Sequence, residues 1–159
     1  MRVNLPVTAE EYDYPAEYML VSTTDPQGRI THCNPAFIDA SGYSYDELIG
    51  EPHNLIRHPD MPPQAYKDLW ATIGRGLSWT GLVKNRRKNG GFYWVRANVT
   101  PIMENGKPRS YMSVRTKPAR TETEQAEALY ALLRRDHEAG RVTIRLHQGR
   151  VIYPGLRGR

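Results

Sequence analysis

The sequence predicts an α+β domain in which five antiparallel strands form a sheet with short helices over one face and a longer helix leaving it. Two observations carry this prediction. Residues 77–117 contain three extended runs joined by turns with Asn-Gly, a strong short-range signal for antiparallel hairpins. Residues 19–34 contain two more extended runs, and the segment between the two groups has the proline and glycine spacing of short helices.

Composition is that of an ordinary soluble domain. The chain has 159 residues, of which 39% are hydrophobic and 25% are charged. Mean hydropathy is −0.65, and no apolar run approaches the ~20 residues of a membrane-spanning helix. No secretory signal pattern follows Met1, so we expect a cytoplasmic location. Cys33 is the only cysteine, which excludes disulfide frameworks and cysteine-rich metal sites.

The net charge of +5 comes entirely from one end of the chain. Residues 1–133 hold equal numbers of basic and acidic side chains, whereas residues 134–159 hold seven arginines against Asp136 and Glu138. A basic end suits a nucleic-acid arm, a segment near an anionic membrane surface, or a solvated tail. The charge alone does not identify a partner.

The first elements are an extension and a hairpin. Residues 1–18 contain a capping-box spacing, but Tyr-Asp-Tyr-Pro at 12–15 ends any helix there. Residues 19–24 and 29–34 are predicted strands. The turn between them, Asp-Pro-Gln-Gly, has the residues that a tight turn prefers at each position.

Short helices follow the hairpin. Pro35 begins one helix and Gly42 ends it, and the capping box from Ser44 begins a second. Prolines prevent a long helix over residues 52–62. A longer helix begins at Pro63, where apolar residues recur at helical spacing, and it ends at two glycines.

The second half of the chain supplies the other strands and the last helix. We predict strands over residues 77–87, 92–103 and 109–117. Residues 121–139 form a helix with a capping box at Thr121, arginines near its carboxyl end and a glycine after it.

No enzyme is predicted, because the familiar catalytic motifs are missing. The glycines near residue 76 do not complete a dinucleotide fingerprint, since Trp79 stands at the third position. There is no P-loop, Gly-x-Ser-x-Gly elbow, His-Glu-x-x-His or Cys-x-x-Cys.

Several strings carry a resemblance to a known family. Two of them resemble the PAS-domain signature: Asn-Pro-Ala-Phe from Asn34, which Ser-Gly-Tyr-Ser-Tyr-Asp-Glu-Leu-Ile-Gly-Glu-Pro soon follows, and Asn-Arg-Arg-Lys-Asn-Gly-Gly-Phe-Tyr-Trp-Val from Asn85. More specific strings are similar to the bacterial aerotaxis receptor family. They are Pro-His-Asn-Leu-Ile-Arg-His-Pro-Asp-Met-Pro at 52–62, Val-Lys-Asn-Arg-Arg-Lys-Asn-Gly at 83–90 and Tyr-Trp-Val-Arg-Ala-Asn at 93–98.

The resemblance implies an FAD-binding redox sensor for aerotaxis. In that family a cytoplasmic PAS domain holds FAD and precedes a membrane anchor, a HAMP domain and a kinase-control domain. The implied partners are the HAMP domain of the same receptor, a chemotaxis histidine kinase reached indirectly, and a second copy in a homodimer, with the inner membrane nearby and no nucleic acid. The implied division of the chain is an extension at 1–18, a PAS sensor domain at 19–118, an exit helix at 119–139 and a basic tail at 140–159.

Five polar candidates follow from the family strings. Arg57 can offer a bidentate fork to phosphate or to an adenine edge, or it can pair with Asp60. His53 can donate to the cofactor or cap the turn after its proline. His58 and Asp60 either contact the ligand or brace one another. Asn85 can satisfy both a flavin carbonyl and a ring N–H, and strand parity favours an inward side chain for it.

Five further candidates have an equally ordinary structural explanation. Trp70 lies on the apolar face of a helix, where core packing and flavin contact are both compatible with its position. Trp79 and Tyr93 are weaker cases of the same kind. Asn34 can contact the ligand or cap the helix that follows it, and Asn98 can supply a polar contact.

Comparison with flavin-binding LOV domains refines the implied site. The photoactive cysteine of LOV domains falls at His53, so the resemblance implies no flavin–cysteine adduct. The second LOV asparagine falls at Val95, which leaves the pyrimidine contacts partly unassigned. On the last strand Tyr111, Ser113 and Arg115 share one face, and the sequence leaves open which face meets the ring.

Two other functions remain open from the residues. A haem-binding PAS gas sensor would use His53 or His58 as its axial ligand. A ligand-free PAS module would use its exposed sheet or its exit helix for dimerisation or other interactions.

Overall fold

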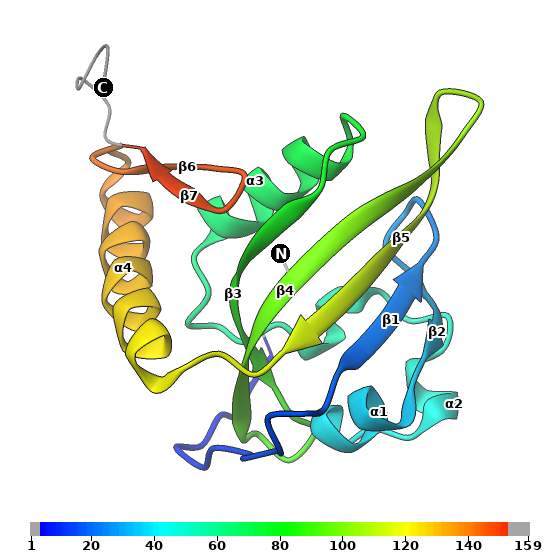
Figure 1. Ribbon diagram of the computed structural model, residues 1–159. Coiled ribbons are helices and arrows are strands. Elements are labelled where there is room, and N and C mark those ends of the chain that lie inside the picture. Colours follow the sequence, from blue (N-terminus) through cyan, green and yellow to red (C-terminus); the bar gives the residue numbers. More distant parts are fainter. Residues whose placement is uncertain (1–3, 153–159) are drawn as a thin grey trace.

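The computed structural model describes residues 4–152 and confirms the predicted five-stranded antiparallel sheet (Figure 1). In space the strands follow the order β2-β1-β5-β4-β3. The first strand along the chain, β1, therefore pairs with the last strand of this sheet, β5, which lies at its centre. The strand bounds are β1 Leu20–Thr24, β2 Ile30–Cys33, β3 Trp79–Arg86, β4 Phe92–Glu104 and β5 Lys107–Thr116.

Helices before β3 cover one face of this sheet (Figure 1). They are α1 Pro35–Ser41, α2 Tyr45–Leu48, the 3₁₀ helix η1 His53–Ile56 and α3 Pro63–Ile73. The predicted capping box of α2 is present, with Ser44 and Glu47 each accepting a hydrogen bond from the other's backbone N–H. Asn34 is the N-cap of α1, where its Oδ1 accepts from the Phe37 N–H at 3.0 Å.

The hairpin between β4 and β5 is tighter than the sequence predicts. Lys107 pairs with Glu104, so the connection is the two residues Asn105 and Gly106. Their φ angles are +54° and +77°. This left-handed conformation suits a primed turn, and it explains why Asn-Gly stands there.

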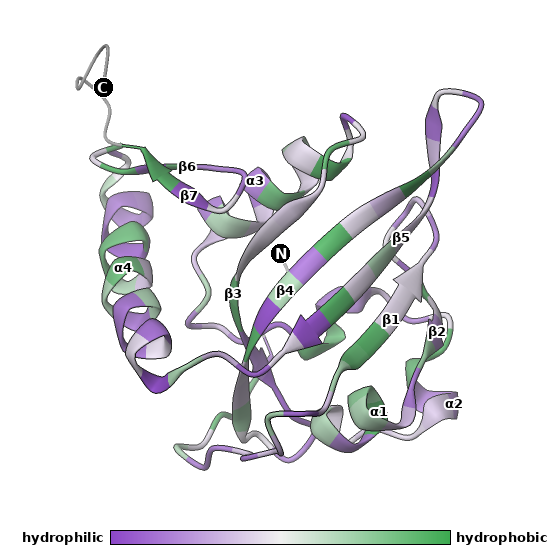
Figure 2. Ribbon diagram, in the orientation of Figure 1, coloured by the Kyte–Doolittle hydropathy of each residue, from purple (hydrophilic) through white to green (hydrophobic). Residues whose placement is uncertain are grey.

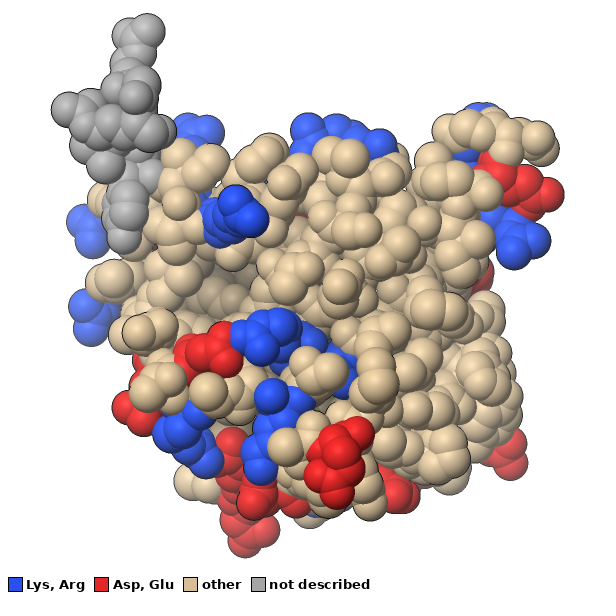
Figure 3. All heavy atoms as spheres, viewed as in Figure 1, with Lys and Arg blue, Asp and Glu red and all other residues tan. Residues whose placement is uncertain are grey.

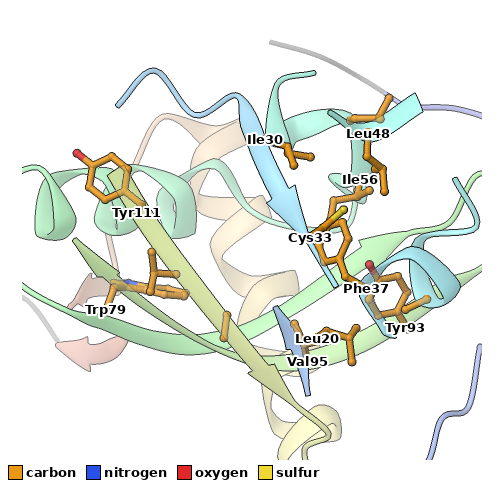
Figure 4. Close-up of a cluster of buried hydrophobic side chains, with 14 of the residues drawn as sticks. Leu20, Ile30, Cys33, Phe37, Leu48, Ile56, Trp79, Tyr93, Val95 and Tyr111 are labelled. Atoms are coloured by element: carbon orange, nitrogen blue, oxygen red, sulfur yellow. The ribbon is translucent and has the colours of Figure 1, made fainter. Parts of the chain in front are cut away.

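The main core lies between the inner face of the sheet and the helices. Its largest fully buried members include Phe37, Tyr93, Leu20 and Ile30. In Figure 4 Phe37 and Tyr93 lie at one end of the cluster, and Trp79 and Tyr111 lie apart from them at the other. Figure 2 shows the matching alternation of hydrophobic and hydrophilic residues along β4 and β5.

The exit helix α4 (Arg120–Ala139) packs on a second, smaller core. Its apolar stripe of Ala126, Tyr130 and Leu133 is buried against Met61 of the segment before α3 and Trp94 of the outer sheet face. The helix begins one residue earlier than expected. The predicted capping box at Thr121 does not form, and Glu122 instead accepts from the Ala119 N–H at 3.0 Å.

A small hairpin follows α4 within the segment expected to be a basic tail. Its strands β6 (Arg145–His147) and β7 (Arg150–Ile152) pack beside α3. The turn between them includes Gly149, where a Cβ atom would lie 1.8 Å from the Thr80 carbonyl oxygen. The sequence did not predict this docking, because no periodicity is detectable in three-residue strands. Residues 153–159 of the expected tail lie outside the described residues.

Many charged side chains on the surface lie beside a partner of opposite charge. On the face drawn in Figure 3, most Lys and Arg side chains lie near the edges or beside acidic ones. Arg96, for example, forms an ion pair with Glu122 of α4, and Lys84 pairs with Asp60 at 2.8 Å. Within residues 4–152 no helix is long and apolar enough to cross a membrane.

Asp68 of α3 holds the small hairpin in place. Its carboxylate accepts from the backbone N–H groups of Gln148 at 2.9 Å and Gly149 at 2.7 Å, and also from Trp79 Nε1 at 2.8 Å. We expect Asp68→Ala to speed amide hydrogen exchange at Gln148 and Gly149 by about ten- to a hundredfold, because hydrogen bonds to a charged acceptor contribute ~1.5–3 kcal/mol. Lys67→Ala, at the exposed neighbouring position, is the control. Unchanged exchange in Asp68→Ala would refute the role of this carboxylate.

Candidate functional site

A cavity of about 560 Å³ lies between the inner face of the sheet and the helices η1 and α3. This volume is in the range of small-molecule and cofactor sites. Trp70 lines the cavity and is 42% exposed, so the cavity opens to solvent beside α3. Gly28 also lines the cavity and lies against Trp70, since a Cβ atom at Gly28 would lie 3.2 Å from the Trp70 ring.

Strand parity decides which side chains form the cavity wall. Alternate residues of a strand point to the same face, so each strand contributes every second side chain. On β5 this resolves the face that the sequence left open, because Tyr111, Ser113 and Arg115 all point inward. The sheet residues that line the cavity are Ser22, Thr24, Trp79, Val83, Asn85, Ala97, Val99, Tyr111, Ser113 and Arg115.

Asn85 lines the cavity together with Val83, as expected from their position on the same face of the strand. The residue is only 4% exposed, and its backbone also pairs with Arg57 in an isolated antiparallel bridge. An amide in this position offers both a donor and an acceptor to a ligand in a largely apolar setting.

Arg57 lies at the helical side of the same cavity. Its guanidinium carbon is 3.8 Å from the centroid of the Tyr66 ring, and its carbonyl accepts from Asn4 Nδ2 at 2.8 Å. The alternative ion pair with Asp60 does not form, because that carboxylate pairs with Lys84 instead. Stacking leaves the edge of the guanidinium available for bidentate hydrogen bonds.

His53 and Arg115 form a polar group inside the cavity. Arg115 Nη2 donates to His53 Nε2 at 2.7 Å and to Ser22 Oγ at 3.0 Å. Because a guanidinium only donates, His53 Nε2 is an unprotonated acceptor. Burial, with the Arg115 charge beside it, lowers the pKa of His53 to about 3. His53 is therefore neutral at physiological pH.

Arg115 is the site residue that sequence reasoning missed. It is 4% exposed, and burial lowers its pKa to about 10. The sequence did contain a signal for it. Arg115 shares a strand face with Tyr111 and Ser113, and a charged side chain that points into a domain is unusual. Which face was inward became known only from the fold.

His58 and Asp60 brace one another outside the cavity. The Asp60 backbone N–H donates to His58 Nδ1 at 3.0 Å, and the ring of His58 meets Phe92 edge-on. Neither side chain lines the cavity. The structure thus favours the bracing role for this pair over ligand contact.

Three other candidates also lie away from the cavity surface. Asn34 uses its amide on the backbone, accepting from Val21 N–H at 3.0 Å and donating to the Met19 carbonyl at 2.8 Å. Asn98 is exposed on the outer face of β4. Tyr93 is fully buried in the main core, beyond the cavity wall. Trp70 and Trp79, by contrast, both line the cavity.

Acid should destabilise the protein through its buried histidines. Burial lowers the pKa of His53 to about 3, and burial together with Lys84 lowers the pKa of His58. The unfolded chain takes up a proton at each histidine near pH 6.5, while the folded chain does not. Stability is therefore complete above about pH 6.5 and declines as the pH falls below it, by up to about 1.4 kcal/mol per pH unit for each histidine.

Urea unfolding at pH 7, 6 and 5 measures this decline. We expect His53→Gln to reduce the slope, since glutamine keeps an acceptor for Arg115 but does not titrate. The exposed His32→Gln should retain the full slope. A free energy of unfolding that is constant from pH 7 to 5 would contradict the prediction.

The sheet order, the helical cover and the ligand-sized cavity define a PAS-type sensor domain. The family model for the PAS fold matches residues 30–115, and the chain belongs to this family. It is 46% identical to the aerotaxis receptor of Escherichia coli over 153 residues, which are 96% of this chain and 29% of that receptor. The recognised resemblance to the aerotaxis receptor PAS domain is thereby confirmed.

Other similarities are more distant. The nitrogen fixation regulatory protein of Klebsiella pneumoniae is 30% identical over 95 residues, or 59% of this chain and 19% of that protein. A LOV domain solved with a flavin analogue has a TM-score of 0.61 at 20% identity and covers 76% of this chain and 88% of its own. The dark structure of the Aureochrome1 LOV domain has a TM-score of 0.59 at 21% identity, covering 76% and 86%. At this identity the two LOV structures show a shared fold alone. The chain spans under a third of either curated relative.

Proposed function

We propose that this chain is an FAD-binding redox sensor domain for aerotaxis that reports the oxidation state of the flavin to a HAMP and kinase-control module. The observation that carries the proposal is the cavity of about 560 Å³, whose mainly apolar wall contains a few polar groups from opposite sides. The 46% identity to an aerotaxis receptor supports the same conclusion.

The residues present fit the chemistry of FAD. The cofactor needs an apolar slot for its ring, an amide for the pyrimidine edge and cations for its diphosphate. Trp79, Val83 and Val99 line such a slot, Asn85 offers the amide and Arg57 offers a guanidinium fork. When bound, FAD supplies the electron chemistry, and the protein supplies position and electrostatics.

Signalling would depend on how Asn85 responds to a change in its ligand. An amide with one donor edge and one acceptor edge is satisfied only by a complementary partner. If the partner's hydrogen-bonding pattern changes, the amide must rotate or leave a buried polar group unsatisfied at ~1–3 kcal/mol. That free energy is enough to shift a two-state equilibrium in the surrounding structure.

Strand β3 offers a route from the cavity to the exit helix. Val83 lines the cavity and also contacts the second core, and the Tyr130 hydroxyl of α4 donates to the Leu82 carbonyl at 2.5 Å. We propose that α4 carries the signal to a HAMP domain near the inner membrane and, indirectly, to a chemotaxis histidine kinase in a homodimeric receptor.

Two observations favour flavin redox chemistry over the alternatives. Cys33 does not line the cavity and His53 occupies the expected LOV cysteine position, so no cysteine is available there for an adduct. For haem, His53 Nε2 already accepts from Arg115 and His58 lies outside the cavity.

An absorption spectrum of the purified protein, repeated after anaerobic dithionite, tests the proposal. We expect paired blue and near-ultraviolet bands that bleach on reduction, and FAD released on heating. A single intense Soret band would instead establish a haem sensor. If no chromophore is present even after incubation with FAD, the flavin proposal fails and a ligand-free interaction module remains.

Asn85→Asp is expected to shift the flavin reduction potential or weaken FAD binding. The substitution keeps the size of the side chain but replaces the amide donor with an acceptor or a buried charge. Redox titration and FAD titration measure the two effects. Asn98→Asp, on the exposed outer face of β4, is the matched control. A titration curve for Asn85→Asp identical to that of the unmodified protein would remove Asn85 from the site.

A further inference from the structure

Arg115 is a buried cation whose contacts are all uncharged. Its guanidinium donates to the Leu20 carbonyl at 3.4 Å, to Ser22 Oγ at 3.0 Å and to His53 Nε2 at 2.7 Å, and its carbon lies 5.0 Å from the Phe37 ring centroid. Among the described residues, none of the ion pairs includes Arg115. The positive charge is thus solvated by dipoles but not neutralised.

Burying such a charge is unfavourable unless an anion is nearby. Removing a charged group from water costs several kcal/mol, and buried charges in proteins are ordinarily paired. Arginine cannot avoid this cost by losing its proton at physiological pH. Where the protein supplies no carboxylate, a ligand in the adjoining space is the natural source of the negative charge.

The adjoining space is the cavity, and a second polar atom faces it. Ser113 lies two residues before Arg115 on the same face of β5, lines the cavity and is 8% exposed. Its Oγ atom is buried without a hydrogen-bond partner in the described structure. A buried hydroxyl without a partner costs ~1–3 kcal/mol, which a ligand acceptor would relieve.

A second buried arginine, Arg86, lies outside the cavity. It is also buried, at 8% exposed, and it too takes part in no ion pair among the described residues. Its Nε donates to the Pro6 carbonyl, and it does not line the cavity. Arg86 therefore lies outside the cavity and serves as a matched control.

We propose that Arg115 and Ser113 form an anion subsite of the cavity, which binds negative charge carried by FAD. This inference rests on the proposed function. The charge has two sources in that ligand: the diphosphate, which is always anionic, and the ring, which gains negative charge when it is reduced. In the second case Arg115 raises the reduction potential by binding the reduced form more tightly.

The test compares Arg115→Met with the unmodified protein and with Arg86→Met. Affinity is measured for oxidised FAD in air and for reduced FAD under anaerobic conditions, and the reduction potential is titrated. Circular dichroism checks folding. Arg115→Gln, which keeps one amide donor for Ser22 or His53, is the second variant if Arg115→Met does not fold. Arg115→Lys, which retains the charge, is expected to preserve most of the binding.

If the ring is the source, Arg115→Met should bind reduced FAD at least tenfold more weakly with little change for the oxidised form. That ratio corresponds to a potential lowered by about 30 mV for a two-electron couple. If the diphosphate is the source, both forms should weaken equally, by at least tenfold, at an unchanged potential. Ser113→Ala should change the FAD affinities in the same direction as Arg115→Met, but by a smaller factor.

Two further outcomes are distinguishable. If the unmodified protein binds FAD but Arg115→Met and Arg115→Gln keep both affinities within twofold and the potential unchanged, the anion subsite is refuted while the proposed function stands. If the unmodified protein binds no FAD, the proposed function fails and the subsite for FAD fails with it.

Discussion

Arg57→Ala is expected to give a folded protein that purifies colourless. The guanidinium lines the cavity and stacks on Tyr66, with a centroid distance of 3.8 Å, while its backbone is held by Asn4 and by the bridge to Asn85. The substitution leaves those backbone contacts in place and removes only the fork. Hydrogen bonds to a charged group contribute ~1.5–3 kcal/mol, so FAD affinity should fall by about ten- to a hundredfold.

FAD titration followed by flavin fluorescence measures the loss. Arg75→Ala, at an exposed position in the turn after α3, should bind FAD normally. Arg57→Lys separates charge from geometry, because lysine keeps the charge but not the planar fork. Stoichiometric FAD in purified Arg57→Ala would remove Arg57 from the site.

Leu133→Ala is expected to lower the free energy of unfolding by about 2–5 kcal/mol, the usual cost of truncating a fully buried leucine. Leu133 is 0% exposed and lies in the second core, which joins α4 to Met61, Trp94 and the edge of α3. A loss of this size is a large fraction of the roughly 5–15 kcal/mol by which native proteins are stable. Chemical denaturation followed by tryptophan fluorescence measures the change.

The neighbouring Leu132 supplies the control. It is 46% exposed and lies outside the buried stripe of α4, and Leu132→Ala has the same change in composition and helix propensity. We expect Leu132→Ala to alter the free energy of unfolding by about 0.5 kcal/mol or less. Equal effects of the two substitutions would mean that α4 is not docked through its buried stripe. If α4 transmits the signal, Leu133→Ala should also uncouple α4 from the cavity.

The cavity and the exit helix both contact strand β3. The inner face of β3 lines the cavity with Val83 and Asn85, while its outer side meets α4 through the Leu82 carbonyl. With the cavity on one face of β3 and α4 on the other, displacement at one face would be felt at the other, because interiors are close-packed. The coupling itself is part of the proposed function, and the Leu133→Ala variant is its most direct test.

Most of the fold could be predicted from the sequence because its signals are local. Asn-Gly turns, the capping box at Ser44 and the prolines that begin α1 and α3 each act within a few residues. The parity of a strand is also local, so it was possible to place Asn85 beside Val83 before the structure was known. The small hairpin lacked such signals, and its docking depends on Asp68, about eighty residues away in the sequence.

The candidate site was less predictable because a side chain's role depends on which partners the fold brings to it. Asn34 was a candidate for ligand contact or for capping the helix after it, and its amide is used by the backbone of β1 and α1. His58 accepts a hydrogen bond from the Asp60 backbone N–H, and the Asp60 carboxylate pairs with Lys84, while neither side chain lines the cavity.

The sequence by itself determined the five strands of the main sheet, most of the helices and the family of this protein, since all three follow from short-range patterns. Only the tertiary structure decided that β5 turns Arg115 and Ser113 inward and that Asn98 faces outward. The physical reason is that alternation along a strand defines two faces but not which is buried. That choice is made when helices from elsewhere in the chain pack on one of them.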